Sequence, residues 1–248
     1  MRVLSSALCI AVLPALLLAQ APGRFPPDSL VNTKVIPHNT PVIQVVGMMR
    51  NFAGGLGVRC QFCHVGEEGQ PLAQFDFASD QKRTKQVARQ MMRMVAEINA
   101  RLDTLPGRTN PGLQVTCQTC HRGTNRPVPL AQLIEEAGTA GGADSALRAY
   151  QALRQRYYGR DAYDFGENSL SSAAFRLARA NKFDEALRVL RVNDSLFPNS
   201  SALNVFKGNI LLMRADTAGA AAAFREAVRL DPQNGEARGR LRSIGQQP

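Results

Sequence analysis

Residues 55–66 read GLGVRCQFCHVG, and residues 112–123 read GLQVTCQTCHRG. The two stretches align without a gap and are identical at eight of twelve positions. Each ends in Cys-x-x-Cys-His, a spacing that lets two thiols form thioethers with the vinyl groups of one haem while the histidine binds its iron. The repeat therefore predicts two covalently bound c-type haems. The attachment and ligand residues would be Cys60, Cys63, His64, Cys117, Cys120 and His121.

Zinc sites and thiol redox motifs also use Cys-x-x-Cys. Zinc ribbons commonly separate their Cys pairs by about 15 to 20 residues, whereas 53 residues lie between Cys63 and Cys117. That spacing alone does not exclude zinc, but a four-Cys zinc site would not need a histidine directly after each pair. A thioredoxin-like site would need a βαβ pattern around one pair, and neither copy has one. The pattern favours haem over zinc.

The first 21 residues have the layout of a secretory signal peptide. Arg2 precedes an apolar run at residues 3–18, and small residues follow near Ala19 and Ala21. A retained membrane anchor is the alternative, although the run is short for a bilayer span. Of the five cysteines, Cys9 lies in the presumed signal and four lie in the motifs, so none is left for a disulfide. We expect a periplasmic or otherwise exported protein, for which membrane association is not required.

The formal net charge is +10, with a pI near 10. Two haems would bring four propionates, so the charge of the holoprotein should be roughly +6. The basic residues are spread along the helices and form no runs, which is typical of solvated faces. The charge therefore predicts an acidic redox partner protein and not a nucleic acid. Arg59, Arg122 and Arg126 flank the motifs and are candidates to pair with propionates.

Each motif follows a predicted amphipathic helix that carries methionine. The first helix covers about residues 41–56, and the second covers about residues 79–103, with Ser79 or Asp80 as its N-cap. The thioether of methionine is the common second axial ligand of c-type haem iron. The local candidates are Met48, Met49, Met91, Met92 and Met94, among which periodicity favours Met49, Met91 and Met94. His38, which lies outside both motifs, is the alternative ligand for a bis-histidine site.

The segment from about Asn32 to Pro129 resembles the cytochrome subunit of purple-bacterial photosynthetic reaction centres, in which helix-turn-CxxCH units come in pairs. The resemblance is carried by Met49 with LGVRC at 56–60, by ARQMMRM at 88–94 running into Ile98-Asn99, and by VTCQTCHRG at 115–123. It implies that Met49 is the axial ligand of the first haem and Met91 that of the second. Met94 matches a position that is not a ligand. The photosynthetic subunit has two such pairs, whereas this chain has one.

A 34-residue period follows the second motif, because residues 167–200 align with residues 201–234. The matched positions are Ala174 with Gly208, Leu177 with Leu211, Ala186 with Ala220, Leu190 with Phe224, Leu196 with Leu230, and Pro198 with Pro232. Small residues at helix crossings, large apolar residues between them and a closing proline resemble tetratricopeptide repeats. Further helices are predicted at 143–158 and 236–244.

The sequence therefore predicts an all-α protein with a dihaem cytochrome domain of few helices and long loops, followed by a short helical repeat array. The predicted ranges are 1–21 for the signal peptide, 22–140 for the cytochrome domain and 141–248 for the repeats. The last boundary follows a stretch of small and acidic residues that ends in Gly141-Gly142. Two repeats are few for an independent solenoid, so we expect the array to lean on the haem domain or on a partner. It is interpreted as a docking module or as a structural appendage.

The predicted function is one-electron transfer between redox partners, since two six-coordinate irons leave no position for a substrate and the protein would not be an enzyme. Two alternatives stay open. A dihaem peroxidase-type enzyme would keep one haem with an open axial site. A repeat-based scaffold would carry the cytochrome as a tethered passenger.

Overall fold

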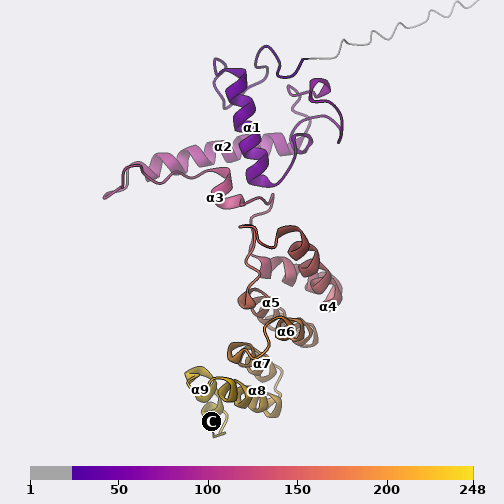
Figure 1. Cartoon of the computed structure of the whole chain (residues 1–248), viewed down its shortest axis with the longest axis vertical. Helices are drawn as coiled ribbons and strands as arrows, with labels where there is room; N and C mark the ends of the chain where they lie inside the picture. Colours follow the sequence, from indigo (N-terminus) through magenta and orange to yellow (C-terminus); the bar gives the residue numbers. More distant parts are fainter. Residues whose placement is uncertain (1–23, 248) are drawn as a thin grey trace, which may run out of the picture. The chain divides into compact units, whose positions relative to one another are not determined.

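The structure is a computed structural model that describes residues 24–247, and within this range it contains nine α-helices and no β-strand (Figure 1). The helices are α1 (Val42–Leu56), α2 (Arg83–Leu102), α3 (Cys117–His121), α4 (Leu130–Tyr157), α5 (Glu167–Arg179), α6 (Phe183–Leu196), α7 (Ser201–Met213), α8 (Thr217–Leu230) and α9 (Gly235–Ser243). Two short 3-10 helices lie at Cys60–Phe62 and Leu72–Gln74. The predicted all-α class is confirmed.

The predicted signal peptide, residues 1–21, lies outside the described residues. Among residues 24–247, no helix combines the length and the apolar character that a membrane span requires.

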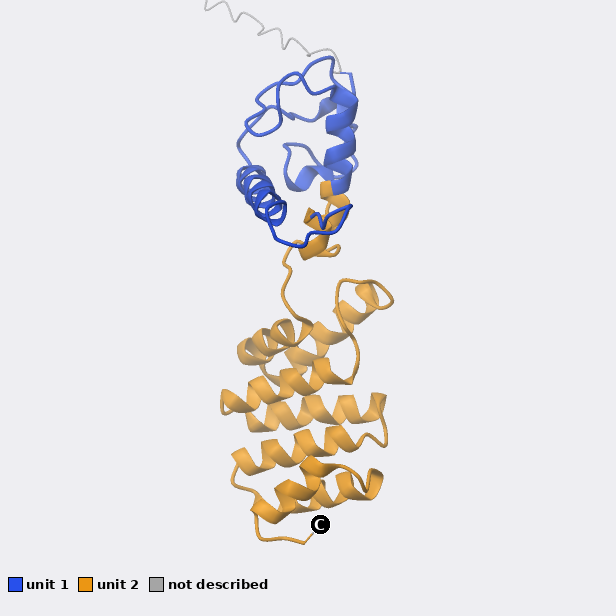
Figure 2. Ribbon diagram, turned by 90° about the vertical axis from the view of Figure 1, so that its left-hand side faces the viewer, with its two compact units in different colours: residues 1–51, 59–114 blue, residues 52–58, 115–248 orange. Residues whose placement is uncertain are grey.

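The chain forms two compact units, which Figure 2 shows in different colours. Within the described residues, the first comprises residues 24–51 and 59–114, and the second comprises residues 52–58 and 115–247. The last turns of α1 therefore count with the second unit, and the two Cys-x-x-Cys-His motifs belong to different units. The domain ranges 22–140 and 141–248 stay predictions.

The first unit holds few buried side chains. Of its described residues, only Lys85 is buried. On α2, the side chains of Val87, Met91 and Met94 are between 40% and 45% exposed. The protein therefore covers the apolar face of α2 only in part within the described residues.

The second unit has an apolar core that extends from α4 to α9. One cluster of buried residues runs from α4 to α7, and another runs from α7 to α9. The largest fully buried apolar side chains are Ile134, Leu170, Leu177, Val189, Ile210, Phe224 and Leu241. Helices that are neighbours in sequence also pack against each other, as is usual for helical repeats.

Helix α4 is kinked at Gly141 and Gly142. Gly142 has φ 72°, a left-handed conformation that glycine adopts without steric cost. Before the kink, Leu130, Ala131 and Ile134 are buried in the same cluster as residues of α5 and α6. The stretch that sequence assigns to a boundary is therefore helical on both sides of the kink, and its first part packs with the repeats.

The predicted period appears as two equivalent helix pairs. Helices α5 and α7 both span 13 residues and begin at Glu167 and Ser201, which are 34 residues apart. Helices α6 and α8 both span 14 residues and begin at Phe183 and Thr217, again 34 residues apart. The repeat-like helical array is confirmed.

Gly208 and Phe224 form a compensating pair inside the second helix pair. A Cβ on Gly208 would lie 2.4 Å from the Phe224 ring, and Phe224 is fully buried. The equivalent positions in the first pair hold Ala174, which is larger than Gly208, and Leu190, which is smaller than Phe224. The two crossings thus reach similar packing with different residues.

Asn193 occupies a position where the repeat pattern normally has a small residue. It is fully buried, and its Nδ2 donates to the carbonyl oxygen of Glu167 at 2.8 Å and to Ser171 Oγ at 3.0 Å. The equivalents of Asn193 and Ser171 in the second pair are Ala227 and Val205. A polar pair in one repeat therefore replaces an apolar pair in the other.

Candidate functional site

The first motif forms a 3-10 turn at Cys60–Phe62. The backbone N–H groups of Cys63 and His64 both donate to the carbonyl oxygen of Cys60, at 3.2 and 3.0 Å. Cys60 and Cys63 are partly buried, and burial raises the pKa of the Cys63 thiol. The turn thus places both thiols and the imidazole within one short segment.

The second motif forms the one-turn helix α3. The backbone N–H of Thr116 donates to Thr119 Oγ1 at 3.0 Å, and the N–H of Thr119 donates to the Thr116 carbonyl oxygen at 3.2 Å. In the first motif the backbone bond recurs, since the N–H of Phe62 donates to the Arg59 carbonyl oxygen at 3.0 Å, but Phe62 has no hydroxyl to accept from the N–H of Arg59. The two motifs therefore share the backbone bond and differ in the side-chain cap, with a 3-10 turn in the first copy and an α-turn in the second.

His121 is oriented by a backbone hydrogen bond. Its Nδ1 lies 2.8 Å from the carbonyl oxygen of Thr124. A carbonyl only accepts, so Nδ1 carries the proton, and the lone pair of Nε2 is left for a metal. Thr124 is itself 3% exposed, and its Oγ1 donates to the carbonyl oxygen of Arg126 at 2.9 Å.

His64 is held by apolar packing. Its ring meets the Phe77 ring edge-on, with the centroids 5.0 Å apart. Burial, followed by the charge of Lys85, lowers the pKa of His64 to about 4. The Phe77 carbonyl opposes this shift, although no hydrogen bond of normal geometry reaches the buried Nδ1. His64 is therefore neutral at physiological pH, the form that binds a metal.

Lys85 secures the loop that carries Phe77. Its Nζ donates to the carbonyl oxygens of Phe77 at 2.8 Å, Ala78 at 3.1 Å and Ser79 at 2.7 Å, and it lies 3.3 Å from Asp80 Oδ1. Lys85 is only 9% exposed. A buried ammonium is costly unless all its protons are bonded, and here each has an acceptor.

Arg89 extends this network to the segment before α1. It pairs with Asp80 at 2.8 Å and donates to the carbonyl oxygen of Asn32 at 2.9 Å, while Asn32 Nδ2 donates to the Ala78 carbonyl oxygen at 2.6 Å. Hydrogen bonds from Arg89, Asn32 and Lys85 hold the pKa of Asp80 well below its usual range. No local sequence pattern indicated this network, because lysine and arginine on a helix usually indicate a solvated face.

The predicted methionine ligands lie on α1 and α2. Met49 is partly buried, whereas Met91 is 40% exposed. Both belong to the first unit together with His64, while His121 belongs to the second unit. The axial roles of Met49 and Met91 stay predictions. The alternative ligand His38 is exposed, and its Nδ1 lies 2.8 Å from Thr33 Oγ1.

The glycines at the end of α1 bring its backbone against the second motif. The carbonyl oxygen of Gly55 accepts from the N–H of Gly123 at 2.8 Å, and a Cβ on Gly55 would lie 3.3 Å from Cys117 Cβ. Gly57 has φ 65°, and a Cβ there would lie 2.0 Å from the Gly123 carbonyl oxygen. These positions require glycine for close approach.

The arginines that flank the motifs have protein partners in two cases. Arg126 forms a two-bond ion pair with Glu136, and Arg59 lies 3.5 Å from Glu68. Their predicted pairing with propionates stays a prediction.

The residues fit a large, flat apolar cofactor better than a bare metal ion. Within residues 24–247, no three or more His, Cys, Asp or Glu side chains gather into a group that could hold a metal ion. The described part of the first unit buries no apolar side chain, yet Val87, Met91 and Met94 present an apolar face. A haem fixed by the thiols could cover such a face and supply the missing core.

A family model described as the photosynthetic reaction centre cytochrome C subunit matches residues 67–159. The matched part of the chain is similar to this family. The match includes Met91, the second motif and the whole of α4, but it begins after the first motif. This match supports the interpretation of the second motif as a c-type haem site.

Two photosynthetic reaction center cytochrome c subunits are also similar to this chain. That of Rubrivivax gelatinosus (strain NBRC 100245 / IL144) is 30% identical over 117 residues, which are 42% of this chain and 30% of the relative. That of Thermochromatium tepidum is 34% identical over 99 residues, which are 36% of this chain and 23% of the relative. The chain thus covers less than a third of either reaction centre cytochrome.

Among solved structures, the crystal structure of PcrH in complex with the chaperone binding region of PopB contains a chain that matches with a TM-score of 0.30 and 17% identity. The match covers 47% of this chain and 89% of that chain. A score this low supports no conclusion about fold or function.

Proposed function

We propose that the protein is an exported dihaem c-type cytochrome that passes single electrons between redox partner proteins. The observation that carries the proposal is the duplicated Cys-x-x-Cys-His stretch, in whose second copy the Thr124 carbonyl already orients His121. Similarity to reaction centre cytochromes supports the same function. When bound, haem supplies reversible one-electron chemistry. The chain attaches it, orients it and excludes water from it.

Each residue type has a distinct task in this proposal. The four cysteine thiols attach the haems. Neutral His64 would offer a ring nitrogen to one iron, and His121, whose Nδ1 bonds to the Thr124 carbonyl, would offer its Nε2 to the other. The thioethers of Met49 and Met91 would complete both coordination shells and raise the reduction potentials relative to bis-histidine sites. Two complete shells leave no position for a substrate, so the proposed protein is a carrier and not an enzyme.

We further propose that the C-terminal helix pairs are tetratricopeptide-like repeats that dock a protein partner. The two clusters of buried residues run from α4 to α9, and the exposed faces of these helices would serve recognition. The excess of Lys and Arg in the chain favours an acidic partner.

The number of haems per chain tests the proposed function directly. Protein matured with a cytochrome c assembly system should contain two haems that resist acidified acetone, as counted by the alkaline pyridine haemochrome. Replacing both Cys60 and Cys63 with Ala should leave one, because the second motif keeps its own attachment residues. A colourless product, or pigment that acetone extracts, would refute the proposal.

Replacing Met49 or Met91 with Ala should remove one axial thioether. We expect the ferric spectrum of that haem to acquire a high-spin component and its reduction equilibrium to change by about tenfold or more, equivalent to about 59 mV for a one-electron couple. Met94→Ala is the matched control on α2, since Met94 is similarly exposed. An effect of Met94→Ala without one of Met91→Ala would overturn the assignment. Rapid carbon monoxide binding by the unmodified protein would instead support a peroxidase-type enzyme.

A further inference from the structure

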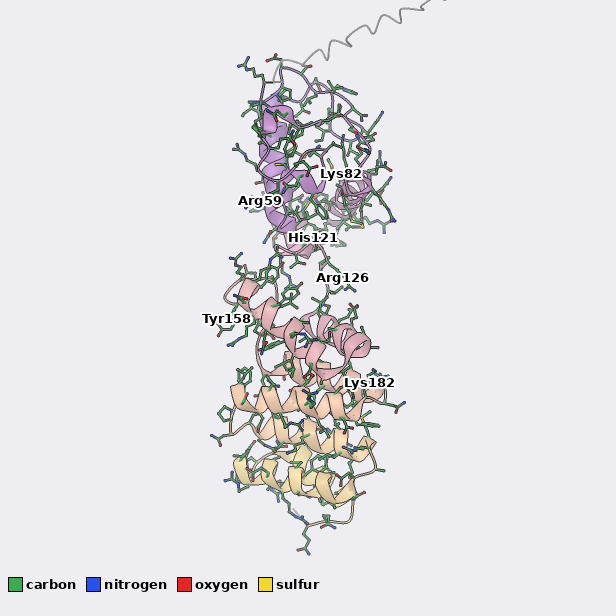
Figure 3. All side chains as sticks on the ribbon, turned by 90° about the vertical axis from the view of Figure 1, so that its right-hand side faces the viewer. Arg59, Lys82, His121, Arg126, Tyr158 and Lys182 are labelled. Atoms are coloured by element: carbon green, nitrogen blue, oxygen red, sulfur yellow. The ribbon has the colours of Figure 1, made fainter. Side chains whose placement is uncertain are left out.

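Three hydrogen-bonded contacts, joined through the covalent frames of Thr124 and Arg126, link His121 to helix α4. The imidazole Nδ1 donates to the Thr124 carbonyl oxygen at 2.8 Å, and Thr124 Oγ1 donates to the Arg126 carbonyl oxygen at 2.9 Å. The Arg126 guanidinium then donates to both carboxylate oxygens of Glu136, at 2.6 and 2.7 Å. Figure 3 shows His121 and Arg126 on the segment that leads from α3 into α4. All four residues belong to the second unit.

The middle of this series has little freedom to move. Thr124 is 3% exposed, and its backbone N–H donates to the His121 carbonyl oxygen at 2.9 Å. The N–H of Gly123 donates to the Gly55 carbonyl oxygen at 2.8 Å. The Thr124 side chain is bonded to the backbone of Arg126, which couples the position of that backbone to the residue whose carbonyl orients His121.

The α4 end of the series is fixed by the repeat core. Leu130 and Ile134 are at most 3% exposed and pack in the cluster that includes α5 and α6. Gln132 Nε2 donates to Glu136 Oε1 at 3.0 Å, which further fixes the carboxylate. Arg126, and then Gln132, lower the pKa of Glu136 to about 2, so the carboxylate is ionised at physiological pH.

We infer that Arg126 and Glu136 are positioning residues for His121. Through them, helix α4 helps to set the reduction potential of the second haem. The inference rests on the proposed function, since it requires haem at the second motif. The hydrogen bond at Nδ1 governs both the direction of the imidazole and its strength as an iron ligand. Contacts with α4 that fix the Thr124 carbonyl therefore fix both the direction of the imidazole and its strength as a ligand.

A purely structural role for the ion pair predicts a different outcome. Arg126 and Glu136 are 53% and 42% exposed at their side chains, and ion pairs this exposed add little to global stability. Glu136→Gln should therefore fold. If the pair served only surface packing, removing its charge would leave the haem unchanged.

The test compares Glu136→Gln and Arg126→Gln with Glu135→Gln in holoprotein. Glu135 is adjacent on α4 and pairs with Arg176 of α5 at 3.3 Å, so it matches the lost charge without contacting Arg126. We expect Glu136→Gln and Arg126→Gln each to change the reduction equilibrium of one haem by about threefold or more, with the double variant similar to either single one. Glu135→Gln should leave the reduction equilibrium of both haems unchanged. The exchanged pair Arg126→Glu/Glu136→Arg should return the reduction equilibrium part of the way to that of the unmodified protein.

The affected haem is identified in a background that carries Cys60→Ala and Cys63→Ala, where only the second motif can hold haem. In that background, Glu136→Gln and Arg126→Gln should still shift the reduction equilibrium. The shift should vanish when Cys117 and Cys120 are replaced instead. A haemochrome count that falls only in Glu136→Gln and Arg126→Gln also supports positioning. Equal potentials and equal haem content in Glu136→Gln, Glu135→Gln and the unmodified protein would overturn the inference. Absence of haem from the second motif in the unmodified protein would instead refute the proposed function.

Discussion

Chains produced without haem are expected to be cut rapidly by trypsin within residues 24–114 and to leave a resistant fragment that contains α4 to α9. The described part of the first unit buries Lys85 and no apolar side chain, whereas the buried apolar residues of residues 24–247 begin at Leu130. A segment without a core cannot offset the conformational entropy of folding. The covalent haem would supply the missing apolar contacts, so its absence should unfold this unit selectively.

The measurement is limited proteolysis of apo and holo chains, with fragments identified by mass. Cleavage within residues 24–114 should be at least about tenfold faster in the apo chain, because cleavage follows the population of locally open states. Phe224→Ala is the control, since it removes a fully buried ring and should weaken only the resistant repeat fragment, in both forms. Equal protection of residues 24–114 with and without haem would contradict the prediction.

Periodicity and spacing predicted the parts of the fold that local sequence determines. The expected first helix at about 41–56 corresponds to α1, and the 34-residue period recurs in the helix pairs. The second helix was expected to begin at Ser79 or Asp80, whereas α2 begins at Arg83. The Asp80 carboxylate pairs with Arg89 and Lys85 and is therefore unavailable as an N-cap.

The features that sequence reasoning missed depend on pairs that no local pattern indicates. Arg126 and Glu136 are separated by a short segment with two prolines and the first turns of α4, and their pairing depends on how α4 packs. The stretch before Gly141 contains small and acidic residues that resemble a linker, yet Leu130 and Ile134 are enough to bury its first part. Such contacts follow from tertiary packing and become visible only once the helices are placed.

Lys85→Met is expected to destabilise the loop that carries Phe77 and to alter the surroundings of His64. The substitution leaves the carbonyls of Phe77, Ala78 and Ser79 without their shared donor. Removing one partner of a buried ionic and hydrogen-bonded group commonly costs about 3 kcal/mol or more, since the remaining polar groups stay desolvated. Met has a similar length and is apolar, so the loss is of hydrogen bonds and charge more than of volume.

The effect should be measured in holoprotein by chemical denaturation followed through haem absorption, and by amide hydrogen exchange of residues 77–80. Lys85→Met should lower the free energy of unfolding of the first haem site and speed exchange at these amides, while Lys85→Arg should retain part of the stability. Arg83→Met, an exposed position on the same helix, should change neither quantity by more than about 0.5 kcal/mol. Similar behaviour of Lys85→Met and Arg83→Met would mean that the buried ammonium does not hold this loop. A selective effect would identify a charged residue that stabilises the first site without contacting the iron, because Phe77 packs directly on the His64 ring.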